Sequence, residues 1–368
     1  MGVPDLSDYP WDAVTPFRER AHRHPGGAVD LSIGSPIDAT PAVIANALAT
    51  ASDAHGYPAT AGSPQLRAAI AAWYQRRRGV PGLAPENTLP TVGSKELVAL
   101  LPLLLGLGPG DVVVHPGAAY PSYAVGAQVV GATAVAEDDP QLWPEQTRLV
   151  WLNSPGNPDG RVLDVEQLRQ AVTRARECSA VIASDECYAE LGWDAPWDRQ
   201  RIPSVLDPAV TAGELNGILS VYSLSKQSNL AGFRAAFLAG DGELIARLLT
   251  ARKHLGLMLP SPVQRAMIAA LGDDEHVQQQ RERYRQRREL LLPALQAAGF
   301  RVDHSAAGLY LWATEGRDAW DSMARLAELG IVAGPGHFYG TSSDRYLRLS
   351  LTAATDRVAE AAARLRAA

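Results

Sequence analysis

The chain has 368 residues, of which 46% are hydrophobic and 20% charged, and its formal net charge is −6. This length exceeds what a single hydrophobic core usually supports, so we expect two closely packed domains. The composition excludes a disordered chain, and the negative charge gives no reason to expect nucleic acid or a membrane as a partner. The longest apolar stretch, near residues 97–107, is too short to span a bilayer.

The start of the chain has no basic segment followed by an apolar run, so we expect no signal peptide. Cys178 and Cys187 do not form a Cys-x-x-Cys pair, and we expect both to be reduced core residues of a cytoplasmic protein. The sequence contains only three lysines, Lys95, Lys226 and Lys253. Any chemistry that requires a lysine amine therefore has three candidates.

Helical and strand patterns alternate from about residue 40, after a segment of some thirty residues that looks like an arm. Ser63 and Pro64 suit the N-cap and first position of a helix that ends at Gly79. Strands are expected at residues 112–114, 149–152, 181–183, 218–221 and 235–238. This alternation predicts a mainly parallel sheet covered by helices on both faces. Ligands of such sheets bind beyond the carboxyl ends of the strands.

The pattern changes after about residue 255. A long charged helix is expected near residues 273–298, and another helix near 318–329, with strands near 300–302, 309–312 and 346–351. We therefore expect an arm with part of the small domain at residues 1–37, a large domain at 38–255 and a small α+β domain at 256–368.

Polar segments of an unusual kind follow three of the expected strands, and a fourth precedes the last one. They are Asn-Ser-Pro-Gly-Asn-Pro-Asp-Gly at 153–160, Ser-Asp-Glu-Cys-Tyr at 184–188, Ser-Leu-Ser-Lys at 223–226 and Gly-Phe-Arg at 232–234. Each motif alone is weak, but the four in this order are a strong signal. The chain resembles the class I and II aminotransferases, which bind pyridoxal 5′-phosphate (PLP), over nearly its whole length. The resemblance implies PLP-transferase fold type I, with a seven-stranded sheet in the large PLP-binding domain, and no metal site.

A PLP enzyme needs a lysine amine for the cofactor aldehyde, a carboxylate for its pyridine nitrogen and donors for its phosphate. Lys226 follows a strand in a Ser-x-Ser context and is the expected Schiff-base lysine and catalytic base. Asp185 would pair with the pyridine nitrogen, although an aspartate here could also cap a turn. Tyr188 and Asn157 would contact the cofactor's 3′-oxygen, with an ordinary Asn-Pro turn as the alternative for Asn157.

The phosphate would lie at the start of the helix that follows Gly93, Ser94 and Lys95, because free N–H groups at a helix N-terminus bind anions. Arg234 and Ser223 would add a guanidinium fork and a hydroxyl. The sequence leaves open whether the Lys95 side chain touches the phosphate or lies on the helix surface.

The resemblance also assigns residues to the cofactor ring, the substrate and a second subunit. Tyr120 would stack on the pyridine ring, with core packing as the alternative. Arg348 lies in an apolar strand and would hold the substrate α-carboxylate, unless it forms a structural salt bridge. Gly34 and Asn157 would also face the substrate. Tyr57 would reach the PLP phosphate of the partner chain, which predicts a homodimer with shared active sites, unless it packs within its own subunit.

Segments 6–12, 31–36 and 93–98 look more specifically like actinobacterial N-succinyldiaminopimelate aminotransferases. The resemblance implies a ping-pong exchange between N-succinyl-LL-2,6-diaminopimelate and 2-oxoglutarate. Arg18, Arg252 and Lys253 are candidates for reading a distal carboxylate, each also interpretable as an ordinary surface charge. The alternatives are an aminotransferase for another amino acid and a PLP-dependent carbon–sulfur β-lyase.

Two other classes fit the sequence poorly. A PLP-fold transcription regulator carries an added DNA-binding domain, and neither such a segment nor a basic patch is present. The glycine-rich segment 106–110 precedes an expected strand instead of following one, so it lacks the context of a dinucleotide-binding loop.

Overall fold

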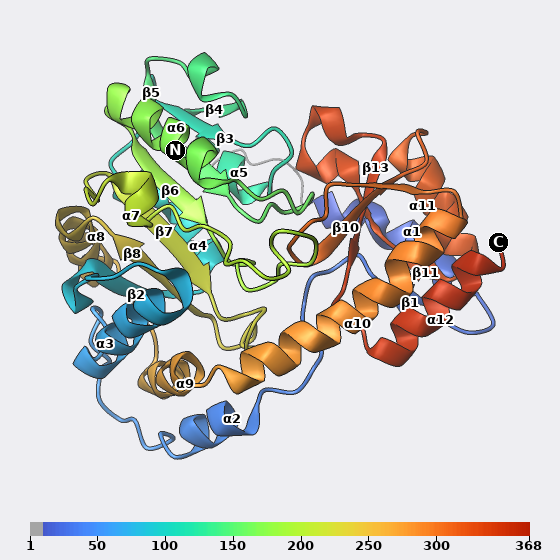
Figure 1. The fold of residues 1–368 in the computed structure, drawn as a ribbon, viewed down its shortest axis with the longest axis horizontal. Coiled ribbons are helices and arrows are strands. Elements are labelled where there is room, and N and C mark those ends of the chain that lie inside the picture. The colour runs from blue at the N-terminus through green and yellow to red at the C-terminus, as the bar shows by residue number, and fades with distance from the viewer. Residues whose placement is uncertain (1–9) are drawn as a thin grey trace, which may run out of the picture.

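The computed structural model of the protein describes residues 10–368 and contains a large and a small body (Figure 1). The large body is built on a sheet with the strand order β2-β8-β7-β6-β5-β3-β4. Its strands are β2 (Thr88–Val92), β3 (Val112–His115), β4 (Thr133–Ala136), β5 (Thr147–Asn153), β6 (Val181–Asp185), β7 (Ile218–Ser223) and β8 (Ala235–Gly240). Only β8 runs against the others. The predicted seven-stranded, mainly parallel sheet is therefore confirmed.

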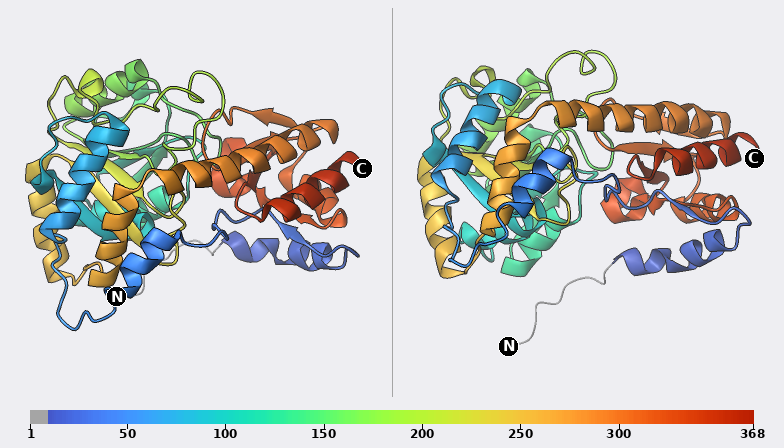
Figure 2. Two further views of the ribbon diagram at one scale, coloured as in Figure 1. Left: turned by 60° about the horizontal axis from the view of Figure 1, so that its bottom comes forward. Right: turned by 90° about the horizontal axis from the view of Figure 1, so that it is seen from below.

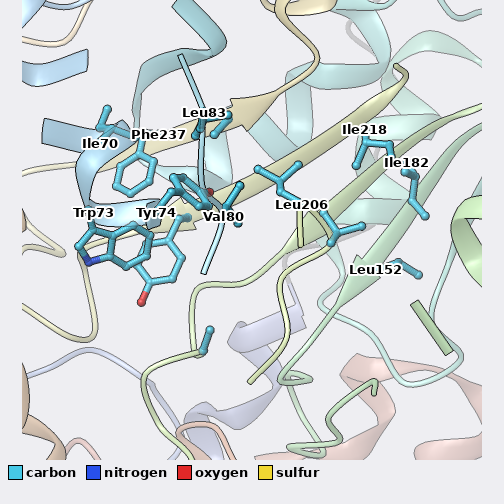
Figure 3. Packing of buried hydrophobic residues seen from close by; sticks show 14 of the residues in the cluster. Ile70, Trp73, Tyr74, Val80, Leu83, Leu152, Ile182, Leu206, Ile218 and Phe237 are labelled. Carbon is cyan, nitrogen blue, oxygen red and sulfur yellow. The ribbon is translucent and has the colours of Figure 1, made fainter. Parts of the chain in front are cut away.

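Helices cover both faces of this sheet, which explains why its central strands are buried at nearly every position. One face packs against α3 (Pro64–Trp73), α6 (Val165–Glu177) and α9 (Ser261–Gly272), and Figure 3 shows part of this core, including Trp73 and Phe237. The other face packs against α4 (Ser94–Leu104), α5 (Ser122–Val130) and α8 (Gly242–His254). The Ser63 hydroxyl caps α3 by accepting a hydrogen bond from the backbone N–H of Leu66, as its sequence predicts.

The small body contains an antiparallel sheet with the order β12-β13-β10-β9 and a short parallel pair, β1 with β11. Its strands are β1 (Val29–Asp30), β9 (Arg301–Asp303), β10 (Tyr310–Thr314), β11 (Ile331–Val332), β12 (Gly334–Pro335) and β13 (Tyr346–Ser350). Its helices are α1 (Thr15–His22), α10 (Glu275–Ala297), α11 (Ala319–Glu328) and α12 (Thr355–Arg366). The long helix α10 runs from the large body along the small one (Figure 2). The remaining α-helices of the described residues are α2 (Ala42–Ala49), beside α9, and α7 (Pro208–Thr211).

One boundary of the sequence-based division differs from the packing. The division after residue 255 assigns α9 to the small domain, but its buried Val263, Ala266 and Met267 belong to the core of the large body. Val14 and Ala21 are buried in the small-body core, where α1 packs against α11, as expected for residues 1–37 contributing part of the small domain. Segment 6–12 lies mostly outside the described residues. No helix among residues 10–368 is long and apolar enough to cross a membrane.

Candidate active site

Three neighbouring strands of the large sheet end in polar residues at one edge. Asn153 ends β5, Asp185 ends β6 and Ser223 ends β7, and parallel strands bring these carboxyl ends together. The Asn153 amide ties two of the ends by donating a hydrogen bond of 2.9 Å to the Asp185 carbonyl oxygen. The residues that the sequence places after strands are thus gathered at the sheet edge that faces the small body.

The Asp185 carboxylate is buried and has no cationic partner among the described residues. Its Oδ2 accepts a hydrogen bond of 3.0 Å from the Tyr123 hydroxyl, and its Oδ1 accepts one of 3.2 Å from the backbone N–H of Cys187. Burial raises the pKa of Asp185 because it disfavours the charged form, against the effect of these hydrogen bonds. A carboxylate in this setting is suited to a cationic N–H group of a bound molecule.

Lys226 follows β7 and points toward Gly34, whose carbonyl oxygen accepts a hydrogen bond from its Nζ. Burial lowers the pKa of Lys226, and the charges of Arg348 and Arg234 act in the same direction. Lowering the pKa enriches the neutral amine, which is the nucleophilic and basic form. Neither Lys95 nor Lys253 shares this setting, because both side chains are exposed.

Arg348, at the centre of β13, is buried with no carboxylate partner among residues 10–368. It donates hydrogen bonds of 2.9 Å to Asn157 Oδ1 and 2.7 Å to the Ser32 carbonyl oxygen. The ring centroids of Tyr310 and Tyr339 lie 4.0 and 5.0 Å from its guanidinium carbon. The structural salt bridge that would explain a buried arginine is therefore absent from the described residues, and the positive charge is available to an anionic ligand.

A second group of cationic and N–H donors surrounds the start of α4. Gly93 has a positive φ of 77°, and a Cβ there would lie 2.2 Å from a guanidinium nitrogen of Arg234. The Arg234 side chain therefore lies directly over the N-terminus of α4, beside Ser94. The hydroxyls of Ser223 and Ser225 lie 2.8 Å apart on the neighbouring turn. Helix N–H groups, a guanidinium and hydroxyls together are suited to a phosphate group.

Comparison with known proteins gives the family. The family model described as "Aminotransferase class I and II" matches residues 27–365. The chain belongs to the class I and II aminotransferases. Members of this family are PLP-dependent, and the protein is accordingly a PLP-dependent aminotransferase.

The protein is similar in sequence to two curated relatives and in structure to a solved aminotransferase. It is 52% identical over 362 residues to "4-dedimethylamino-4-oxo-anhydrotetracycline transaminase OxyQ" of Streptomyces rimosus, covering 98% of this chain and 99% of that protein. It is also 52% identical to "Probable aminotransferase Rv1178" of Mycobacterium tuberculosis, covering 98% and 85%. A probable N-succinyldiaminopimelate aminotransferase of Thermus thermophilus has a similar structure, with a TM-score of 0.85, 30% identity and coverage of 97% and 99%.

The residues of this site fit PLP in three places. Asp185 offers a carboxylate without a cation, Lys226 an amine with a lowered pKa, and Arg234 with the α4 N-terminus a phosphate cradle. Tyr120 follows β3, is partly buried and packs edge-on against Tyr123 at 6.0 Å, beside Asp185.

Of the other predicted residues, Lys95 lies at the margin of this group and the rest lie apart from it. Tyr57 is 97% exposed and makes no contact with the site in its own chain. The Lys95 amine lies 6.0 Å from the Tyr120 ring centroid. Arg252 is not a surface charge, because it is fully buried in an ion pair with Glu96 at 2.9 Å. Arg18 pairs with Asp30 at 3.3 Å.

Sequence reasoning missed two phenols that line the site, Tyr310 and Tyr339. The Tyr310 hydroxyl lies 3.4 Å from that of Tyr188. Burial acts to raise the pKa of Tyr310, but the nearby charges of Arg348 and Lys226 outweigh it and lower this pKa. Alternation along β10 could have indicated that Tyr310 shares a face with Trp312, but not that this face meets Lys226.

Proposed function

We propose that this aminotransferase holds PLP on Lys226 and transfers amino groups between α-amino acids and 2-oxo acids. The proposal rests on two buried charges of opposite sign, neither of which has a charged partner among the described residues. Among residues 10–368, no cation pairs with Asp185 at the end of β6 and no carboxylate pairs with Arg348 on β13. A cofactor with a protonated ring nitrogen and a substrate with a carboxylate would compensate them respectively.

PLP supplies an aldehyde that takes up an amino group and a ring that makes the neighbouring C–H bond acidic. Asp185 keeps a proton at the ring nitrogen, while Arg234, Ser223, Gly93 and Ser94 hold the phosphate. Tyr120 orients the ring by stacking, and Tyr188 and Asn157 donate to its 3′-oxygen.

The substrate is oriented by Arg348, which binds its α-carboxylate with support from Asn157 and the backbone of Gly34. Lys226, once its amine is free, moves the proton from the substrate Cα, because its lowered pKa makes it a competent base. Release of the oxo acid before the second substrate binds gives ping-pong kinetics.

For the substrate pair, we propose N-succinyl-LL-2,6-diaminopimelate and 2-oxoglutarate. The support is the sequence resemblance of segments 31–36 and 93–98, together with the similar Thermus thermophilus structure. Of the three candidates for the distal carboxylate, Arg252 and Arg18 are paired with Glu96 and Asp30, and Lys253 is exposed in the last turn of α8.

A second candidate has a specific observation in its favour. The 52% identity to OxyQ, over nearly the whole of both chains, supports amino transfer to a ring ketone of a polycyclic compound. Such a substrate has no α-carboxylate at the reacting carbon. The amino donor of the other half-reaction still carries an α-carboxylate, so the comparison uses single turnovers of enzyme loaded with pyridoxamine phosphate. In these, Arg348→Ala should lose amino transfer to 2-oxoglutarate and keep transfer to the ring ketone within about tenfold. Assay of the wild type and this variant with both substrates separates the two candidates.

The test of the cofactor role is borohydride reduction of the purified holoenzyme, followed by peptide mass spectrometry. The pyridoxyl adduct should lie on Lys226, and Lys226→Ala should lose amino transfer while keeping the wild-type circular dichroism. An adduct on Lys95 or Lys253 would contradict the proposal. Formation of pyruvate from an S-substituted cysteine, without dependence on a 2-oxo acid, would favour the carbon–sulfur lyase.

A further inference from the structure

One hydroxyl in the site lacks a partner. Tyr339 ends the short helix Gly336–Tyr339 and is 3% exposed, yet its hydroxyl oxygen makes no hydrogen bond with any described residue. Buried hydroxyls in folded proteins are almost always paired, because an unpaired one loses its bonds to water without replacement. An exception at the edge of a binding site indicates a ligand that completes the pairing.

The position of Tyr339 identifies which part of the ligand it meets. Its ring lies 5.0 Å from the guanidinium carbon of Arg348, on β13 of the small body. Its backbone carbonyl accepts a hydrogen bond of 2.8 Å from Ala119, beside Tyr120 of the large body. Tyr339 therefore contacts both bodies. It lies between the Arg348 guanidinium of the small body and the segment before Tyr120 of the large body.

A carboxylate bound by Arg348 could accept a further hydrogen bond from a second donor. A carboxylate has about four lone-pair sites, more than one guanidinium fork can fill. Two N–H groups of Arg348 are engaged by Asn157 and Ser32, while its Nε has no partner among the described residues. Tyr310, the other phenol over Arg348, already faces the Tyr188 hydroxyl at 3.4 Å. The Tyr339 hydroxyl is the free neutral donor beside the guanidinium.

We propose that the Tyr339 hydroxyl donates a hydrogen bond to the substrate α-carboxylate held by Arg348. This inference rests on the proposed function, in which Arg348 binds that carboxylate. Burial above all raises the pKa of Tyr339, against the opposing charge of Arg348, so the hydroxyl remains a protonated donor at neutral pH.

The experiment removes one oxygen atom and measures ligand binding without turnover. Holoenzyme carrying Tyr339→Phe is titrated calorimetrically with glutarate and with butyrate, two inert carboxylates. Because the lost hydrogen bond is to a charged group, both dissociation constants should rise about tenfold. The melting temperature without ligand should stay equal or rise, since the hydroxyl had no partner to lose.

Tyr74→Phe is the matched control, because the buried Tyr74 hydroxyl donates to Ser220 Oγ at 2.8 Å in the core of the large body. This variant should melt at a lower temperature and bind both carboxylates as the wild type does. Unchanged dissociation constants in Tyr339→Phe overturn the inference, as does a loss confined to glutarate, which would assign Tyr339 to a distal carboxylate. Weaker binding in Tyr339→Phe with no amino transfer by the wild type supports the carboxylate contact while refuting the proposed function.

Discussion

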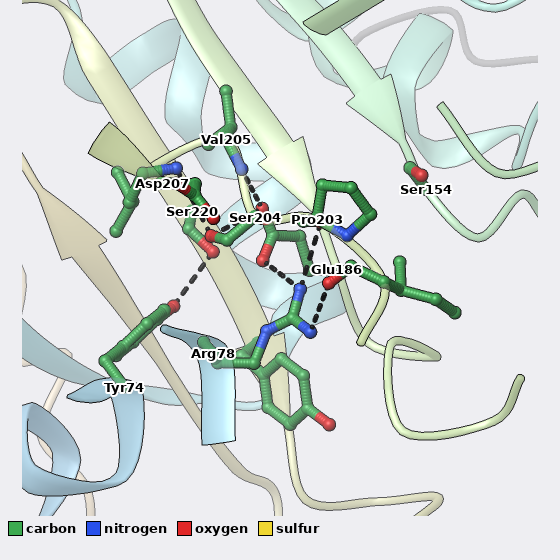
Figure 4. A network of polar contacts seen from close by, with 12 residues as sticks. Tyr74, Arg78, Ser154, Glu186, Pro203, Ser204, Val205, Asp207 and Ser220 are labelled. Atoms are coloured by element: carbon green, nitrogen blue, oxygen red, sulfur yellow. Dashed lines mark hydrogen bonds and ion pairs between the residues drawn. The ribbon is translucent and has the colours of Figure 1, made fainter. Parts of the chain in front are cut away.

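The Arg78 guanidinium and the Glu186 carboxylate form an ion pair of 2.9 Å in which both side chains are almost completely buried. Glu186 directly follows Asp185, at the turn that leaves the central sheet. Its other oxygen accepts hydrogen bonds of 3.1 Å from Ser204 Oγ and 2.7 Å from the backbone N–H of Val205 (Figure 4). This network fixes the backbone next to Asp185, the carboxylate proposed to bind the ring nitrogen of the cofactor.

Replacing one partner of this pair should be far more costly than replacing both. Arg78→Met or Glu186→Leu alone leaves a buried charge unpaired, which lowers the free energy of unfolding by about 3–5 kcal/mol. The double variant Arg78→Met/Glu186→Leu should lose less than the sum of the two, and urea unfolding of all four proteins measures this coupling. Additive losses would show that the two charges do not depend on each other.

Asp185 should favour catalysis at the expense of the stability of the cofactor-free protein. A group whose pKa is raised by folding favours the folded state below its unfolded-state pKa, and this contribution is lost as the pH rises through the raised value. At neutral pH the buried carboxylate therefore destabilises the cofactor-free protein. Asp185→Asn should raise the free energy of unfolding of the cofactor-free protein at pH 7 and reduce kcat by about two orders of magnitude.

The control for this pH effect is Asp303→Asn. The hydrogen bond from Arg301 holds the pKa of Asp303 below its usual value, so its contribution to stability is present at neutral pH and lost in acid. Asp303→Asn should leave kcat unchanged and slightly lower the stability at pH 7. Wild-type turnover by Asp185→Asn would show that Asp185 is only a turn residue.

Local signals in the sequence predicted five of the seven strands of the large sheet, because these are short apolar runs bounded by turn residues, and they predicted which polar residues follow them. They did not mark β2, which contains Pro90, or β4, whose residues are exposed or only partly buried, and the number of seven strands came from the resemblance to the family. Asp185 and Lys226 were found in this way. Tyr339 and Tyr310 were not, because their place depends on how the small body packs against the large one, and no local pattern encodes that packing. The same reason explains Arg252, whose partner Glu96 lies 156 residues away in the sequence.

Gly34 is needed because its surroundings leave no room for a Cβ atom, and not because its backbone is strained. A Cβ at this position would lie 2.1 Å from the Tyr310 hydroxyl oxygen, so an alanine must displace the phenol from Arg348. Displacements of about 1 Å in a site can cost two orders of magnitude in rate, and we expect Gly34→Ala to lower kcat/KM by ten- to a hundredfold. In Gly34→Ala/Tyr310→Ala the collision is absent, so the double variant should be no worse than Tyr310→Ala alone. Losses that multiply would indicate that Gly34 acts independently of Tyr310.

Tyr57 gives the test of the shared active site. The side chain is 97% exposed in a segment bounded by Gly56 and Gly62, so it makes little contact with the described residues of its own chain. On the proposal of a homodimer, its hydroxyl binds the PLP phosphate of the partner chain. A hydrogen bond to a charged group contributes about 1.5–3 kcal/mol, so Tyr57→Phe should weaken PLP binding by about tenfold or more. The stability of the cofactor-free chain should be unchanged, which equilibrium dialysis and thermal unfolding check together.

Mixing subunits separates this role from packing within one chain. Tyr57→Phe chains and Lys226→Ala chains are combined at a limiting PLP concentration, and subunit exchange is verified by native mass spectrometry. In a hybrid dimer with shared sites, one site carries both substitutions and the other carries neither, so activity per Lys226-containing chain should rise above that of the Tyr57→Phe parent. If Tyr57 acts within its own chain, each hybrid site carries one substitution and the mixture gains nothing. Exchange of subunits without any such gain would therefore refute the shared site.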